Sequence, residues 1–128
     1  METLAILVVM SVFGTTYTIP VAEIDTQKVF YGGCRNFDNP VEIDYESLLQ
    51  ETQEYKEVKD DKLEPGTGKY WLLVKEASDR VSNCIQNVAK KENYDLVCSL
   101  GYLAGLETPI PSENITQKII AKIKKFNK

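Results

Sequence analysis

The clearest pattern of apolar and polar positions lies in residues 69–98. Apolar side chains recur there at alternating steps of four and three residues, at Tyr70, Val74, Ala77, Val81, Cys84 and Val88. This spacing places them along one stripe of an α-helix, close to the period of a coiled-coil seam. The pattern ends near residues 91–93, and the apolar run Tyr94–Cys98 that follows is typical of a short β-strand. We therefore predict a long helix at about 69–92 that leads into a buried strand.

The residues before this helix predict a second one at about 44–62, with a thinner apolar face. Asp44 is a suitable N-cap, because its carboxylate can accept hydrogen bonds from the free amides of the first turn. The apolar face consists of Tyr45, Leu48, Leu49, Thr52, Tyr55 and Val58. The break Glu64–Gly68 then separates the two helices, with Thr67 or Gly68 as the cap of the second. Helices joined by about five residues pack antiparallel, so we expect a helical hairpin.

The flanking segments predict a small β-body. Val21–Ile24 begins a strand in the region 20–30, and Gly32–Gly33 breaks the pattern. Residues 34–40 (CRNFDNP) have the composition of a turn. On the other side of the hairpin, residues 94–104 supply a strand and a second short extended segment.

A further amphipathic helix is predicted at about 115–126. Asn114, with Gln117 three residues later, comes close to a capping box. The apolar face of this helix consists of Ile115, Ile119, Ile120, Ile123 and Phe126. The expected fold class is therefore α+β, in a single domain that spans residues 17–128.

Residues 4–13 (LAILVVMSVF) form the most apolar run in the sequence. The run is too short to span a bilayer as a helix, but it has the length of the core of a signal peptide, and Gly14–Thr16 supplies small residues for cleavage. Met1–Thr3 lacks the usual Lys or Arg, so the alternative is a buried strand. We expect residues 1–16 to be a secretory signal peptide, and the protein to be periplasmic or secreted.

Composition and charge narrow the classes of function. The chain has 128 residues, 43% of them apolar and 27% charged, as is ordinary for one globular domain. Its net charge of −4 gives no global electrostatic argument for nucleic acid as a partner. Acidic residues concentrate in 41–65, whereas lysines concentrate in 118–128. These blocks are either solvated helix surfaces or the two ends of a bipolar molecule whose basic end meets an acidic partner.

The sequence offers little for catalysis or metal binding. Histidine, the commonest general base and zinc ligand, is absent from the chain. Cys34, Cys84 and Cys98 lack the close spacing of a metal site, and the last two are expected to be buried small apolar residues. Cys34, beside Arg35, is the one candidate reactive thiol, without a base to activate it. We therefore expect no enzymatic activity, no catalytic residue, no metal and no cofactor.

Three phrases of the sequence, taken in order, resemble the OmpH/Skp family of periplasmic chaperones. They are residues 24–30 (IDTQKVF), 85–97 (IQNVAKKENYDLV) and 114–120 (NITQKII). The resemblance implies a homotrimer with a β-body built by strands of three subunits, and helical arms that hold unfolded outer-membrane proteins. The arm segment here, about 41–81, is shorter than in the best-known members, and Asn114 stands where the family usually has Asp.

From this resemblance, the expected function is that of an ATP-independent holdase for unfolded or outer-membrane-destined polypeptides. The alternative is a non-catalytic envelope or secreted interaction module with the same fold and no chaperone activity. Trp71 lies beside the apolar stripe rather than in it, which favours an exposed anchor for a partner. The residues expected to contact clients or partners are Tyr55, Tyr70, Trp71 and Val74, and those expected in the oligomeric body are Val21, Ile24, Leu96, Val97 and Tyr102. The expected partners are clients or an envelope protein close to a membrane, and further copies of the chain.

Overall fold

The long helix predicted from the apolar stripe is present. In the computed structural model, which describes residues 16–126, helix α4 spans Gly68–Glu92. Thr67 caps it as expected, since its hydroxyl oxygen accepts from the Tyr70 N–H at 3.2 Å. The helix ends at Asn93, whose backbone is left-handed with φ of 61°. The predicted signal peptide lies outside the described residues, except for Thr16.

The buried face of α4 agrees with the predicted stripe from Ala77 onwards and differs before it. Its buried residues are Leu73, Ala77, Val81, Cys84, Ile85, Val88 and Ala89. Tyr70 and Val74, which the stripe included, are only half-buried, and Leu73 is buried in their place. The seam expectation assumed a repeat of 3.5 residues, whereas a straight helix has 3.6, so the buried face shifts over several turns.

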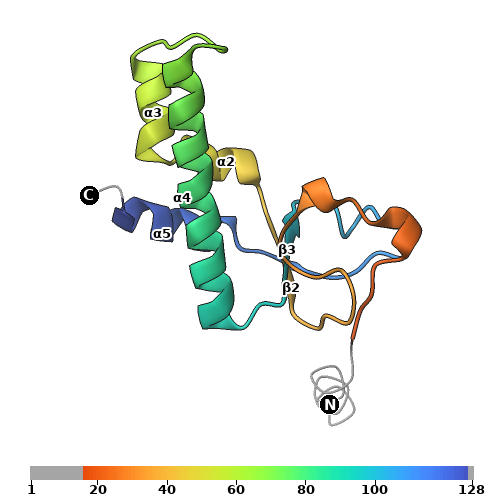
Figure 1. Ribbon diagram of the computed structural model, residues 1–128. Coiled ribbons are helices and arrows are strands. Elements are labelled where there is room, and N and C mark those ends of the chain that lie inside the picture. Colours follow the sequence, from red (N-terminus) through yellow and green to blue (C-terminus); the bar gives the residue numbers. More distant parts are fainter. Residues whose placement is uncertain (1–15, 127–128) are drawn as a thin grey trace.

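The predicted first helix is two helices, α2 (Tyr45–Gln50) and α3 (Gln53–Asp60). Thr52 interrupts them and is fully buried. Its hydroxyl donates to the Leu49 carbonyl at 2.7 Å and accepts from the Tyr55 N–H at 3.1 Å, so it caps α3. Asp44 caps α2 as predicted. The chain then turns at residues 61–67, and α4 runs back alongside α3 as a hairpin (Figure 1).

A four-stranded mixed sheet confirms the predicted α+β class. The strands are β1 (Val29–Gly32), β2 (Pro40–Ile43), β3 (Leu96–Ser99) and β4 (Glu113–Asn114). Their order in the sheet is β1-β3-β2-β4. Strand β3 pairs antiparallel with β1 and parallel with β2, and β2 pairs parallel with β4. Helix α5 (Thr116–Phe126) closes the described chain within one residue of its predicted start.

The structure lacks two of the predicted strands, those at residues 21–24 and 101–105. Residues 21–24 do not form a strand, because the 3-10 helices η1 (Val21–Glu23) and η2 (Thr26–Lys28) occupy this region. The Asp25 side chain accepts from the Gln27 N–H at 3.1 Å, a local bond that competes with strand pairing. The expected second extension, residues 101–105, is a turn in which Gly101 has φ of 89°.

The sheet lies between two buried clusters, and β3 contributes to both. Val97 belongs to the cluster shared with the helices, whereas Leu96 and Cys98 belong to the cluster under the loops. Strand β2 was not predicted, since Pro40 and Glu42 read as turn and surface residues. Glu42 is in fact buried, and its carboxylate accepts from the Leu103 N–H at 2.9 Å. No helix in residues 16–126 is both long enough and apolar enough to cross a membrane.

Candidate partner-binding site

The free end of the hairpin carries an exposed apolar patch. Trp71 and Leu72, neighbours in the first turn of α4, expose 58% and 57% of their surface. The Tyr70 ring is half-buried and meets Trp71 edge to face, with ring centroids 5.2 Å apart. We call Tyr70, Trp71 and Leu72 the tip patch. Two large apolar side chains adjacent in water form a surface that a partner can cover.

The tip patch is held in place by contacts between the two helices of the hairpin. Lys69, at the start of α4, lies 3.7 Å from carboxylate oxygens of both Glu57 and Asp61. These groups are about half exposed, so each pair contributes little stability by itself. Leu73 of α4 and Val58 of α3 are both buried. The first turn of α4 is thus fixed against α3 on one side, and its other side faces solvent.

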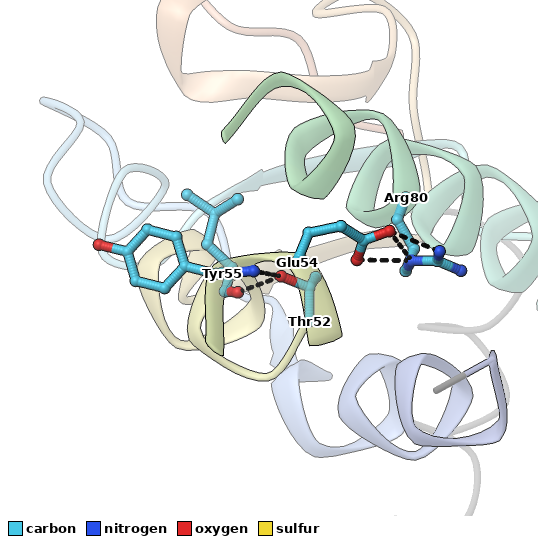
Figure 2. Close-up of polar contacts among 5 residues, drawn as sticks. Thr52, Glu54, Tyr55 and Arg80 are labelled. Carbon is cyan, nitrogen blue, oxygen red and sulfur yellow. Dashed lines mark hydrogen bonds and ion pairs between the residues drawn. The ribbon is translucent and has the colours of Figure 1, made fainter. Parts of the chain in front are cut away.

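A stronger ion pair lies further along the hairpin, between Glu54 of α3 and Arg80 of α4 (Figure 2). The guanidinium Nε lies 3.0 Å from both carboxylate oxygens, and Nη2 lies 2.6 Å from one of them. This hydrogen bonding lowers the pKa of Glu54 and raises the pKa of Arg80. A paired, partly buried Arg and Glu fix the register of α3 on α4.

The structure brings together only some of the predicted contact residues. Tyr70 and Trp71 lie side by side, and Val74 is half-buried one turn further along α4. Tyr55 is half-buried in α3, with the Lys59 ammonium 5.5 Å from its ring centroid. Glu54, the neighbour of Tyr55 in α3, pairs with Arg80 of α4. Arg80 lies nine residues after Trp71, which is roughly 13 Å along α4. Tyr55 is therefore not part of the tip patch.

Leu72 was missed by the sequence reasoning, although a signal was present. Like Trp71, it is a large apolar residue next to the buried stripe rather than in it. A second such residue beside Trp71 indicates a patch, whereas one alone is ordinary for a protein surface.

The residues expected in an oligomeric body occupy different environments. Leu96 and Val97 are fully buried within their own chain, on the central strand β3. Ile24 and Tyr102 are half-buried at the edge of the loop-side cluster. The Tyr102 hydroxyl donates to the Glu23 carbonyl at 2.6 Å and accepts from the Asp25 N–H at 2.9 Å. Val21 exposes 68% of its surface in η1 and contributes to neither cluster.

Within residues 16–126, no group of three or more His, Cys, Asp or Glu side chains is arranged to hold a metal ion. The three cysteines are free thiols. Burial raises the pKa of Cys34, the candidate reactive thiol, and raises that of Cys98 to about 12. A raised pKa leaves less of the nucleophilic thiolate at neutral pH.

A scan against protein-family models, a search of curated proteins and a search of solved structures each find no match for the chain.

Proposed function

We propose that this chain is a non-catalytic, ATP-independent holdase similar to the OmpH/Skp chaperones, which binds apolar segments of unfolded polypeptides at its hairpin. The observation that carries the proposal is the tip patch. Trp71 and Leu72 are exposed neighbours near the start of α4. The start of α4 lies at the end of the hairpin away from the sheet (Figure 1). When a client covers these two side chains, apolar surface is removed from water, which favours binding and requires no chemical step.

The order of elements also supports the proposal. A strand leads into a helical hairpin, the returning helix leads into a buried strand, and a helix ends the described part of the chain. This is the order that the resemblance implies, although the strand directly before the hairpin is β2 rather than the predicted Val21–Ile24. Strands β1 and β4 are the two edges of the sheet, where a second copy of the chain can pair. We propose a homo-oligomer, a trimer by the resemblance, assembled at the sheet.

The proposed location is the periplasm or the outside of the cell, close to a membrane. It rests on the apolar run at residues 4–13 and on the resemblance.

The second candidate is an interaction module of the same fold without chaperone activity. It is favoured by the small size of the tip patch, which offers one anchoring indole and one leucine. A single partner with a matching pocket needs no larger patch, whereas a holdase must cover long apolar segments.

The test compares a Trp71→Ala/Leu72→Ala variant with a Leu100→Ala control, which removes exposed apolar surface outside the hairpin, in the loop after β3. Light scattering follows the aggregation of a denatured outer-membrane β-barrel protein, and size-exclusion chromatography with light scattering gives the oligomeric state. We expect the wild type and the control to suppress aggregation as oligomers, and the hairpin variant to lose suppression while remaining oligomeric.

Two other outcomes decide against the holdase. The interaction module is supported if the wild type does not suppress aggregation and the hairpin variant loses its oligomeric state. A wild type that is strictly monomeric and inactive overturns the proposal. Because Trp71 is the single tryptophan of the chain, its fluorescence reports directly on whether a client covers the tip patch.

A further inference from the structure

A groove lined by lysines lies between helices α4 and α5, at the opposite end of α4 from the tip patch. Its volume is about 190 Å³. The lysines that line it are Lys91 from α4 and Lys118, Lys122 and Lys125 from α5. Val88 and Ala121 also line it and add apolar atoms, and Asn87 and Glu92 complete the lining. We call this site the lysine groove.

Most of the positive charge in the groove lacks an ion-pair partner among residues 16–126. Lys118 is the exception, because its ammonium lies 3.6 Å from Glu92 and donates to the Tyr94 hydroxyl at 2.7 Å. Glu113 adds a weaker attraction to the same lysine. Within residues 16–126, neither Lys91 nor Lys125 has an ion pair within 4 Å. The groove is therefore a positive site in a chain whose net charge is −4.

The helix dipoles explain only part of this arrangement. Lysines in the last turn of a helix are favourable, which accounts for Lys91 and Lys125. Lys118 and Lys122 lie earlier in α5, four residues apart on one face, where like charges repel and destabilise the helix. Lys91 faces them across the groove. An anion bound in the groove would reduce the repulsion among these ammonium groups.

We propose that the lysine groove binds a short acidic segment of a polypeptide partner. Residues 118–125 span roughly 10 Å along α5, and alternate side chains of an extended peptide lie about 7 Å apart. Two carboxylates of such a segment fit along the groove, and its apolar atoms cover Val88 and Ala121. The groove contains lysines and no arginine fork of the kind that favours bidentate phosphate recognition. Its concave shape also suits a peptide better than the flat surface of a bilayer.

The test measures fluorescence anisotropy of a labelled peptide of alternating glutamate and alanine at low salt, with the full protein. The variant is Lys91→Gln/Lys125→Gln, which removes two ammonium groups that make no ion pair with the described part of the chain, so that the described contacts are kept. The control is Lys90→Gln/Lys124→Gln, whose lysines are sequence neighbours on the same two helices and do not line the groove. We expect about tenfold weaker binding for the groove variant and about twofold or less for the control.

Equal losses in the two variants mean diffuse attraction to the basic end and overturn the proposal, as does a wild type that fails to bind the peptide. A third overturning result is binding of vesicles rich in acidic phospholipid that depends on Lys91 and Lys125, without peptide binding. The inference is independent of the holdase. The Trp71→Ala/Leu72→Ala variant is expected to bind the acidic peptide like the wild type, so either proposal can fail alone.

Discussion

Arg80 of α4 and Glu54 of α3 form a bidentate ion pair, with Nε 3.0 Å from both carboxylate oxygens of Glu54 and Nη2 2.6 Å from one of them. The two side chains expose 32% and 16% of their surface, so the pair is partly shielded from water. It is the best-formed contact that we find between the two helices of the described hairpin. The stability of the hairpin should therefore depend on the charge of Glu54.

We predict that Glu54→Gln lowers the free energy of unfolding at pH 7 by about 1–2 kcal/mol. The pKa of Glu54 is lower in the folded protein than in the unfolded chain, mainly because Arg80 donates hydrogen bonds to its carboxylate. The stabilisation is thus full above the ordinary pKa of glutamate and is lost as the pH falls through the lowered, folded-state pKa. Urea unfolding at several pH values should show the two proteins converging at the acidic end.

Glu64→Gln is the control for this experiment, because Glu64 is exposed and makes no ion pair within residues 16–126. It should change stability by less than about 0.5 kcal/mol at any pH. A Glu54→Gln variant as stable as this control at pH 7 would show that the ion pair is not needed.

Gly32, the last residue of β1, and Gly33, which follows the strand, give a matched pair of variants. Gly32 has φ of 84°, and a Cβ there would lie 2.0 Å from the Asp95 carbonyl oxygen, which belongs to the backbone and cannot rotate away. A Cβ at Gly33 would meet no described residue other than its chain neighbours within 4 Å. We predict that Gly32→Ala destabilises the fold by roughly 2–4 kcal/mol through backbone strain and overpacking. Gly33→Ala should stay within about 0.5 kcal/mol of the wild type in the same urea titration.

The periodicity of the sequence was enough to predict α4 and α5. Both helices separate apolar and polar residues at a helical period, and both are amphipathic in the structure. The sheet was predicted poorly, because its signals are not local. Glu42 is buried only because the Leu103 N–H, 61 residues away, donates to its carboxylate. Pro20 and Asp25 precede two 3-10 helices, so the segment 21–24 does not form the predicted strand.

The candidate sites likewise differ in whether they depend on one helix or on the packing of two. Trp71 was predicted as an exposed anchor from its place beside the apolar stripe, which is a local property of one helix. The lysine groove requires α5 to lie across α4, so that Lys91 comes to face Lys118 and Lys122. The sequence indicated a basic end, but only the packing of the two helices turns it into a groove.

Thiol accessibility provides a third prediction. Cys34 is half-buried, whereas Cys84 and Cys98 are fully buried. Burial raises the pKa of all three, that of Cys98 to about 12, so little thiolate exists at pH 7. We predict that a thiol reagent labels Cys34 alone in the native protein, faster as the pH rises, and all three cysteines in denaturant. Mass spectrometry of the labelled peptides checks this, and native labelling of Cys98 would contradict the buried position of β3.

The last prediction concerns Tyr102, which ties the loop after β3 to the N-terminal segment. Its hydroxyl donates to the Glu23 carbonyl at 2.6 Å and accepts from the Asp25 N–H at 2.9 Å. Tyr102→Phe leaves both backbone groups without this partner, and we predict a loss of about 1–2 kcal/mol in the free energy of unfolding. The segment 17–28 should also become more sensitive to limited proteolysis, because this contact holds it against the loop.

Tyr31→Phe is the matched control, since Tyr31 is half-buried and its hydroxyl makes no hydrogen bond to residues 16–126. It removes the same oxygen atom from the same side-chain type, so any general effect of the substitution appears in both variants. If the two variants unfold at the same urea concentration and are cut equally fast, the hydroxyl of Tyr102 is dispensable. A loss confined to Tyr102→Phe, with faster cleavage before residue 29, assigns the stabilisation to the two backbone hydrogen bonds.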